Sequence, residues 1–418
     1  MLQVLNYLLS YILLYIGLLT LYNTHILGFT AQLVIKHLTE NHPELNYALG
    51  ARSLSKLDDI RKKIGVNERI PQFAINDLSH ESKELESLIK RSKVVLSMAG
   101  PYTLYGFSVS TICARYGVHF VDINGEGPSY YQKLLRNLSY KSNLTGSILI
   151  PSTGLDSLPS DIAVYKSVKA LRDNGIFSDI DSSHTSFEGK IKGASGGTIS
   201  SLLTMFDTTA PKDIKEFNDD VWSLSPEASN EMKSHQPQTG LVHYDSYIGK
   251  YSVPWLLGPH NIRVVHRSAS LLPKLYSKTF NYSETLACPS FLSALIRGLF
   301  MVIGGFLFAT FPSFRSFIKS KAPISGTGPS QEQENQSYLE LTNTTKTVDG
   351  KVVHTKIKAK GHPGYSLTSI MCSEVALLLA KDKCKLNGGI YTPSAALGDD
   401  LINELKKYGG FNVETKLD

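Results

Sequence analysis

Two aspartates at the ends of apolar stretches are the residues of this chain best suited to proton transfer. Asp122 stands near the end of the run His119–Ile123, and Asp156 follows the run Ser147–Pro151. A carboxyl group held at a strand end can donate or orient a proton during a reaction. Aspartate also caps helices and turns through its side-chain oxygens, so a structural role is the alternative for both. Asp122 and Asp156 are therefore candidate catalytic residues.

Cationic residues follow another apolar stretch and suit a phosphate. Arg52, Ser53 and Lys56 come directly after Tyr47–Ala51. In a nucleotide-binding sheet, an arginine at this strand end accommodates the 2′-phosphate of NADP(H), whereas NAD(H) is held there by an acidic residue. The fork of a guanidinium matches a phosphate dianion. The pattern favours NADP(H), and the alternative is an ordinary surface arginine on a loop. Asp77, at the end of a third strand, is expected near the adenine.

The elements that would position these residues are clearest between residues 93 and 128. The apolar run Val94–Met98 predicts a buried strand, which Ala99-Gly100-Pro101-Tyr102 ends. Apolar residues then recur at helical spacing from Tyr105 to Tyr116, and His119–Ile123 predicts a second strand. In parallel sheets, ligands bind beyond the carboxyl ends of the strands. Ala99, Gly100, Pro101 and Tyr102 are therefore expected to contact the cofactor.

Alternating strands and helices around this unit predict a Rossmann-type doubly wound parallel sheet. Further strands are expected at Tyr47–Ala51, Ile70–Ile75 and Ser147–Pro151. A second α/β domain is expected from about residue 166. Its clearest feature is a hairpin of Tyr338–Thr345 and Val352–Ala359 joined through Asp349-Gly350. An amphipathic helix at 365–380 and a short one at 399–408 are expected near the C-terminus.

The overall composition excludes several classes of protein. At 418 residues two domains are expected, and the net charge of +6 is not gathered into the block that a nucleic-acid-binding arm would show. The four cysteines stand far apart, in no metal-ligand spacing, so neither a metal site nor a disulfide framework is expected.

The N-terminus is unusual because no Lys, Arg, Asp or Glu occurs between Met1 and Ile35. Its segment Leu2–Leu21 has about the 20 apolar residues that a membrane span needs. A membrane anchor and a buried helix or strand of the first domain are the two interpretations. The phosphate-binding turn that should precede the first helix is reduced to Gly28, Phe29 and Thr30, with a single glycine.

A second apolar run, Phe291–Phe311, is broken only by Arg297 and is followed by Arg315, Lys319 and Lys321. Three structures are compatible with it: a membrane span, a helix or hairpin lying on a lipid surface, or a buried helix. The basic residues are expected at lipid headgroups.

Several motifs together carry a resemblance to a known family. They are Gly50 to Leu57, Ala99 to Tyr102, His119 to Glu126, Gly154 to Asp161, Ser195 to Thr198, Gly326 to Ser330, Gly361 to Tyr365 and Gly388 to Pro393. In this order they resemble the saccharopine dehydrogenase-like oxidoreductases, eukaryotic relatives of the bacterial trans-acting enoyl reductases. The resemblance covers nearly everything after Gly28.

The resemblance implies a Rossmann domain (28–165), a second α/β domain carrying substrate (166–360) and a C-terminal segment (361–418) whose helix returns to the first domain. It also implies NADP(H)-dependent reduction of a lipid-linked substrate in lipid or glycolipid metabolism. The protein is therefore expected at a membrane, either on a lipid droplet or on the endoplasmic reticulum, at the cytosolic face. Separately from the resemblance, a homodimer is a candidate assembly. The alternative is a membrane-binding or lipid-droplet-binding protein that keeps the fold without catalysis.

Residues 1–27 depart from the family pattern. Members open with a strand and a Gly-Ala-Thr-Gly-Phe-Thr-Gly turn, but here residues 1–27 replace the strand and half of the turn, and Ala31 replaces the last glycine. Either pyrophosphate binding has been lost behind a new anchor, or the segment comes from a wrongly assigned exon. Both interpretations predict a chain that folds poorly or binds NADPH weakly.

Overall fold

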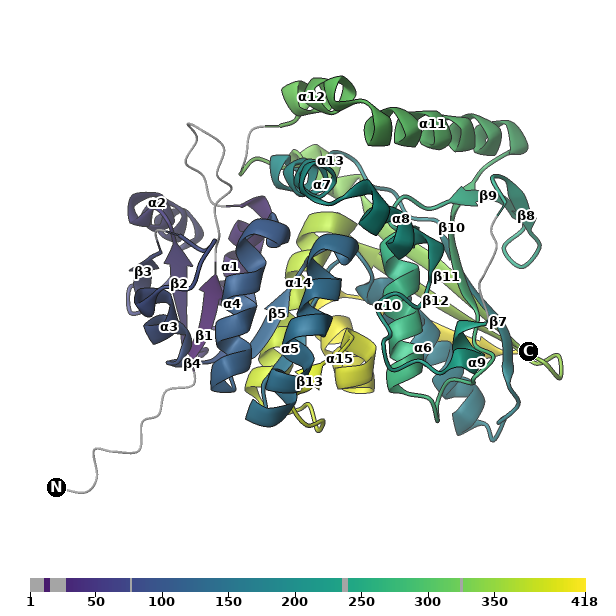
Figure 1. Ribbon diagram of the computed structural model, residues 1–418, viewed down its shortest axis with the longest axis horizontal. Helices are drawn as coiled ribbons and strands as arrows, with labels where there is room; N and C mark the ends of the chain where they lie inside the picture. The colour runs from purple at the N-terminus through teal and green to yellow at the C-terminus, as the bar shows by residue number, and fades with distance from the viewer. Residues whose placement is uncertain (1–10, 16–27, 76, 235–239, 324–325) are drawn as a thin grey trace.

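Two seven-stranded sheets form the framework of the protein (Figure 1). The computed structural model describes residues 11–15, 28–75, 77–234, 240–323 and 326–418. Sheet A contains the early strands and sheet B the later ones, and the C-terminal segment contributes a strand to each. The predicted Rossmann-type domain with a second α/β domain is confirmed.

All pairings in sheet A are parallel. Its strands are, in order across the sheet, β13 (Gly389–Ile390), β6 (Ile148–Ile150), β5 (His119–Asp122), β4 (Ser92–Ser97), β1 (Tyr11–Tyr15), β2 (Tyr47–Ala51) and β3 (Gln72–Ala74). Apart from β13, this is the strand order 3-2-1-4-5-6 of dinucleotide-binding sheets. The order reverses between β1 and β4, which is where such sheets bind their ligand.

The expectation that the first strand is missing is wrong. Tyr11–Tyr15 form β1 in the middle of sheet A, and Leu13 pairs with Ala48 of β2 on one side and with Val95 of β4 on the other. The neighbours of β1 therefore have no exposed edges there. An apolar run without charges suits a strand paired on both sides as well as a membrane span, which is why the sequence pattern alone left both open. The other residues of the predicted anchor lie outside the described residues.

Alternate residues of the central strands supply two separate hydrophobic cores, one on each face of sheet A. Val94, Leu96 and Val121 pack with helices of one face. Val95 and Phe120 pack with helices of the other. The first group contains α1 (Phe29–Asn41), α2 (Leu54–Ile64) and α14 (Thr368–Ala380), and the second α3 (Lys83–Ile89), α4 (Tyr102–Tyr116) and α5 (Gln132–Thr145), which follows a π-helical turn at Gly127–Tyr131. Burial on both faces explains the continuous apolar runs that predicted these strands.

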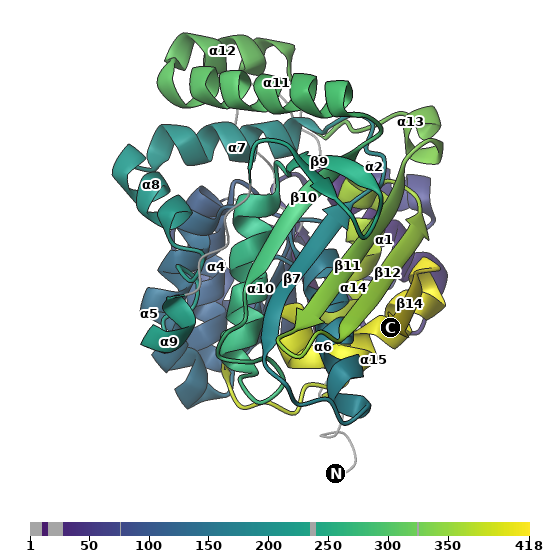
Figure 2. The same ribbon diagram turned by 90° about the vertical axis from the view of Figure 1, so that its right-hand side faces the viewer.

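Sheet B is mixed. Its strands are, in order, β14 (Asn412–Leu417), β12 (Val352–Lys360), β11 (Tyr338–Thr347), β7 (Ile180–Phe187), β10 (Tyr282–Cys288), β9 (Lys250–Pro254) and β8 (His243–Asp245). The predicted hairpin is confirmed as β11 and β12, with Gly350 in the left-handed region at φ 87°. Helices α6 (Leu158–Asp173) and α10 (Gly258–Leu271) pack on one face of this sheet, and Figure 2 looks onto the opposite face.

The C-terminal segment ties the two sheets together. Helix α14 packs on β4, β5 and α1, and β13 extends sheet A beside β6. Helix α15 (Pro393–Gly409) then contacts α14 and α6, and β14 adds to the edge of sheet B. The predicted return to the first domain is confirmed. The prediction that this helix is amphipathic is wrong, because α14 is enclosed by the sheet and two helices and nearly all of its residues are buried.

A separate layer of helices lies beyond α7 (Gly196–Thr208) in both views (Figures 1 and 2). It consists of α11 (Phe291–Thr310) and α12 (Pro312–Lys321), and α12 contacts α7. The buried-helix interpretation of the run 291–311 is wrong, since only 11% of its most apolar window is buried. The remaining short helices are α8 (Pro211–Asp219), α9 (Asn230–Lys233) and α13 (Gln331–Asn335).

Candidate functional site

The carboxyl ends of β1, β2, β4 and β5 meet at one edge of sheet A because the strands are parallel. Most of the predicted site residues follow these strands. Ala99, Gly100, Pro101 and Tyr102 form the turn between β4 and α4, and the peptide bond between Gly100 and Pro101 is cis. The turn therefore lies at the point where the strand order reverses, as expected for a cofactor-binding turn.

The start of α1 is suited to an anionic ligand. Gly28 precedes the helix, Phe29 and Thr30 begin it, and neither a side-chain cap nor an acidic residue occurs in its first turn. Free amides and the helix dipole at such an end attract phosphate groups. The first turn is held firmly, because the ring of Phe29 packs edge-on against Tyr365 at 5.4 Å and fills the space beside Gly328. The described part of the predicted phosphate-binding turn thus fits a pyrophosphate.

The start of α4, by contrast, is occupied by a side chain of the protein itself. The carboxylate of Glu126 accepts hydrogen bonds from the amides of Tyr102 and Thr103 at 2.8 and 2.6 Å, and from the Thr103 hydroxyl at 2.5 Å. Burial raises the pKa of Glu126 despite these hydrogen bonds. Because one carboxylate already uses the free amides of this helix, a phosphate is directed to α1 and not to α4.

The predicted 2′-phosphate site has a consistent arrangement at the end of β2. Arg52 is the first residue after the strand, Ser53 precedes α2, and Lys56 lies in its first turn; all three are half-buried. Two cations beside a helix N-terminus are compatible with a phosphate dianion. Asp77 lies at the outer strand β3, where its carboxylate accepts the Ser79 amide at 2.7 Å and lies 3.2 Å from His80.

Of the two candidate acids, Asp122 is organised as a structural residue. It is fully buried, and its Oδ1 accepts hydrogen bonds from the amides of Asn124 and Ser152, both at 3.0 Å, and from the Asn124 side chain at 2.6 Å. Burial raises its pKa to about 6. These bonds join the loops after β5 and β6. The structural alternative therefore describes Asp122 better than the catalytic one.

Asp156 is placed differently. It is half-buried in the loop between β6 and α6, and burial raises its pKa to about 6. Its carboxylate leans on the loop after β5, since a Cβ on Gly125 would lie 2.7 Å from Asp156 Oδ2. Ser157, not Asp156, occupies the N-cap position of α6. Asp156 therefore keeps the accessibility and the proton affinity that a general acid needs.

Glu284 joins this site and was missed from the sequence. It lies on β10 of sheet B, buried, and its carboxylate accepts hydrogen bonds from Asn261 at 2.8 Å and from the Tyr282 hydroxyl at 2.9 Å. Burial raises its pKa to about 7, and the charge of Asp156 acts in the same direction. Glu284 is therefore a second buried carboxyl group that can hold a proton near neutral pH. An isolated Glu in the strand Tyr282–Cys288 has no sequence signature of this role.

Helix α7 closes over the cofactor-binding turn. A Cβ on Gly100 would lie 3.0 Å from the hydroxyl oxygen of Ser201 on α7. At the start of the helix, Ser195 Oγ accepts the amide of Thr198, and the Ser195 amide donates to the Tyr365 hydroxyl. The Ser195–Thr198 motif therefore positions α7 against the segment that also packs on Phe29.

Comparison with known proteins agrees with this geometry. The family model of the saccharopine dehydrogenase NADP binding domain matches residues 26–147. A candidate trans-acting enoyl reductase of Mycobacterium tuberculosis is 30% identical over 406 residues, which cover 93% of this chain and 96% of the relative. A trans-acting enoyl reductase of Mycobacterium ulcerans is 27% identical over 408 residues, with the same coverage.

Solved structures share the fold at low sequence identity. The apo saccharopine dehydrogenase (L-Glu forming) of Saccharomyces cerevisiae aligns with a TM-score of 0.53 and 15% identity, covering 98% of this chain and 99% of that protein. The homospermidine synthase of Legionella pneumophila, solved with NAD, also has a TM-score of 0.53, with 11% identity over 98% of this chain and 91% of that one. At these identities the similarity concerns the fold alone.

Proposed function

Since the chain belongs to the saccharopine dehydrogenase-like family and carries its NADP(H)-binding domain, we propose that it reduces a lipid-linked substrate at a membrane or lipid-droplet surface. The family is one of oxidoreductases that includes the trans-acting enoyl reductases. The lipid character of the substrate rests on a single observation of the structure, the exposed apolar helix α11.

Reduction of a double bond requires a hydride and a proton. NADPH supplies the hydride when it is bound. The chain supplies the proton, and Asp156 with Glu284 is the best-placed source, because their raised pKa values of about 6 and about 7 leave part of the pair protonated near neutral pH. The hydroxyl of Tyr282 and the amide of Asn261 fix the orientation of Glu284 and act as positioning residues.

Helix α11 presents apolar side chains to solvent around most of its circumference. Phe300 is 76% exposed, Phe306 61% and Ile303 57%. Only Ala294 and Gly298 are buried, and Gly298 packs against Leu241. An exposed helix of 20 residues whose apolar run is broken only by Arg297 is far more than monomeric proteins normally leave in water. This surface supports binding to lipid.

The basic residues of α12, which forms a hairpin with α11, fit a layer of lipid headgroups only in part. Lys319 and Lys321 of α12 are exposed, as the sequence predicted. Arg315 is not directed to headgroups, because its guanidinium pairs with Asp207 of α7 at 2.8 Å and donates to Phe308 O at 2.9 Å. It therefore fixes the hairpin to α7, the helix that closes over the cofactor-binding turn. Helix α7 lies between the cofactor-binding turn and the α11–α12 layer. A lipid surface bound by α11 would therefore face the candidate site across α7.

Vesicle flotation tests the lipid surface directly. The variant carries serine in place of Leu299, Phe300, Ile303 and Phe306 in the full chain. Each substitution removes roughly 1 kcal/mol of the free energy gained when the side chain moves from water into lipid. About 4 kcal/mol in total corresponds to about a 1,000-fold loss of binding to vesicles of phosphatidylcholine and phosphatidylserine. The matched control carries four serines at equally exposed apolar positions elsewhere: Tyr140, Leu144, Phe177 and Val348. Equal binding by the two variants would refute the role of α11.

NADPH oxidation separates the reductase from the non-catalytic alternative. The wild-type chain is mixed with vesicles that contain a long-chain enoyl ester, and NADPH absorbance is followed. Oxidation that requires the ester and falls with the α11 variant supports the proposal. Vesicle binding without oxidation of NADPH would favour a lipid-surface protein that keeps the fold without catalysis. The candidate homodimer stays a prediction, to be checked by sedimentation.

A further inference from the structure

We propose that His37, His42 and Glu374 form a binding site for a divalent transition-metal ion, best matched by Zn²⁺, that joins α1 to the C-terminal helix α14. The three residues are buried, and their ligand atoms all lie within 4.8 Å of one another. No metal site was expected from the sequence, because the histidines and the glutamate are more than 330 residues apart.

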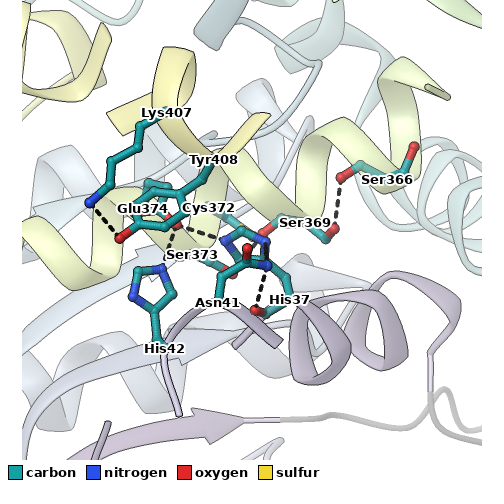
Figure 3. Close-up of polar contacts among 10 residues, drawn as sticks. All are labelled: His37, Asn41, His42, Ser366, Ser369, Cys372, Ser373, Glu374, Lys407 and Tyr408. Carbon is teal, nitrogen blue, oxygen red and sulfur yellow. Dashed lines mark hydrogen bonds and ion pairs between the residues drawn. The ribbon is translucent and has the colours of Figure 1, made fainter. Parts of the chain in front are cut away.

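Both histidines point to one oxygen of the glutamate. His37 Nε2 lies 2.7 Å and His42 Nε2 3.0 Å from Glu374 Oε1 (Figure 3). The second oxygen, Oε2, is buried and has no hydrogen-bond partner among the described residues. The site therefore offers a carboxylate with one oxygen unpartnered among the described residues and two imidazole nitrogens.

This set of donors is chemically selective. Two imidazole nitrogens and one carboxylate suit Zn²⁺, which takes nitrogen and oxygen ligands at about 2.0–2.2 Å in a tetrahedral arrangement. Mg²⁺ and Ca²⁺ prefer sites made of oxygen only. The observed nitrogen-to-oxygen distances are those of hydrogen bonds, so binding would replace the protons shared along them and move the ligands apart by a few tenths of an ångström. A water molecule or the free Oε2 would complete the coordination.

Neighbouring residues hold the ligands in place. Asn41 contacts Nδ1 of His37 at 3.2 Å, one turn further along α1, and the Tyr408 ring of α15 packs against the His42 ring at 4.5 Å (Figure 3). A metal on Nε2 would place the remaining imidazole proton on Nδ1, so Asn41 Nδ2 would lose this contact and keep its hydrogen bond to His37 O at 3.1 Å. The packing of Tyr408 on the His42 ring is an outer contact of the kind that fixes the orientation of metal-bound histidines.

The position of the cluster indicates a structural role for the metal. His37 and His42 lie at the end of α1 that is remote from Gly28, and at 1.5 Å per residue the separation along the helix axis is roughly 12–20 Å. The metal would therefore not touch the cofactor. It would link the first helix of the Rossmann domain to the C-terminal segment that covers the same face of sheet A.

Metal content and stability test the proposal on the full chain. The chelator-treated protein is titrated with ZnCl₂, and bound zinc is measured by mass spectrometry of the metal together with the melting temperature. One equivalent of zinc and a rise in melting temperature are expected. Glu374→Gln and His42→Gln should abolish both.

A control variant and a spectroscopic probe make the outcome independent of folding defects. His80→Gln removes an exposed histidine that lies beside Asp77, and it should bind zinc as the wild type does. Co²⁺ added to the wild-type chain should give the visible absorption of a four-coordinate ion, which the hydrogen-bonded cluster alone cannot produce. Absence of that absorption, or zinc stabilisation that persists in Glu374→Gln, would overturn the assignment and leave a network of hydrogen bonds only.

Discussion

Replacing Glu284 by glutamine is expected to make the stability of the protein fall less as the pH rises from about 5 to 8. Burial raises the pKa of Glu284 from its ordinary 4.5 to about 7. The folded protein then binds this proton more tightly than the unfolded chain does. Its contribution to stability is fully present below about 4.5 and is lost as the pH rises through about 7. Glutamine carries no titrating proton, so the variant lacks this loss.

The size of the effect follows from the two pKa values. At about 1.4 kcal/mol per pH unit, the interval from 4.5 to about 7 corresponds to about 3–4 kcal/mol of unfolding free energy. Domains of this kind are typically stable by only about 5–15 kcal/mol, so the change is readily measured. Asp122, Asp156 and Asp161 also have pKa values raised to about 6 by burial, and they act in the same direction in both proteins. Because Asp156 interacts with Glu284, the difference between wild type and variant reports Glu284 together with that interaction.

Urea unfolding at pH 5, 6, 7 and 8, followed by circular dichroism, measures the effect. Glu340→Gln is the matched control, because the pKa of Glu340 is lowered: burial raises it, but Lys356 and Lys358 outweigh burial. A lowered pKa gives stability that is lost only as the pH falls toward it, so this variant should keep the wild-type slope between pH 5 and 8. If Glu284→Gln loses stability in parallel with the wild type, Glu284 does not hold a proton near neutral pH and the proton source proposed for catalysis is wrong.

Two further substitutions test the cofactor site and the central strand. Arg52→Asp should weaken the binding of NADPH by about tenfold to a hundredfold relative to that of NADH, since a charge-assisted contact is worth roughly 1.5–3 kcal/mol. Fluorescence titration measures the affinity for each cofactor, and an equal loss for the two would contradict the 2′-phosphate assignment. Leu13→Pro should destabilise the protein by on the order of 3 kcal/mol, because proline cannot donate to a strand paired on both sides; an unchanged melting temperature would show that these residues do not form the central strand.

The parallel sheet could be predicted because its strands are buried on both faces. Val94, Val95 and Leu96 point alternately into the two cores and are all fully buried, so the run is apolar throughout. Gly117 ends α4 in the left-handed conformation, at φ 73°, directly after the residues whose helical spacing predicted this helix. These are local signals that neighbouring residues are sufficient to produce.

The misjudged elements depend on distant partners. Residues 11–15 look like part of a membrane span until β2 and β4 are placed on either side of them. Helix α14 appeared amphipathic because Ser, Thr and Glu interrupt its apolar residues, but Glu374 is buried between His37 and His42 and Ser373 bonds back to its own helix. Polar residues inside a core are satisfied by partners that sequence spacing cannot indicate.

The candidate site likewise combines local features that the sequence indicates with contacts between distant segments that it does not. The turns after β2 and β4 were identified because glycine, proline and arginine at strand ends have recognisable roles. The pairing of Glu284 with Asp156, and the capture of the α4 amides by Glu126, arise where separate segments meet. Asp122 illustrates the ambiguity, since the same strand-end aspartate can serve catalysis or hold two loops, and only its three hydrogen-bond donors distinguish the roles.

The return of α14 to sheet A has a consequence for how the chain is made. The six strands β1 to β6 are complete once residue 150 has been synthesised, but the helix that covers β4 and β5 on one face ends at Ala380. At about 5–20 residues per second, a ribosome needs roughly 10–45 s to add the intervening stretch. Val94, Leu96 and Val121 lack part of their cover during that interval, so we expect the nascent chain to expose apolar surface until α14 is made. For the same reason, we expect a chain that stops before α14 to leave this face of sheet A partly uncovered.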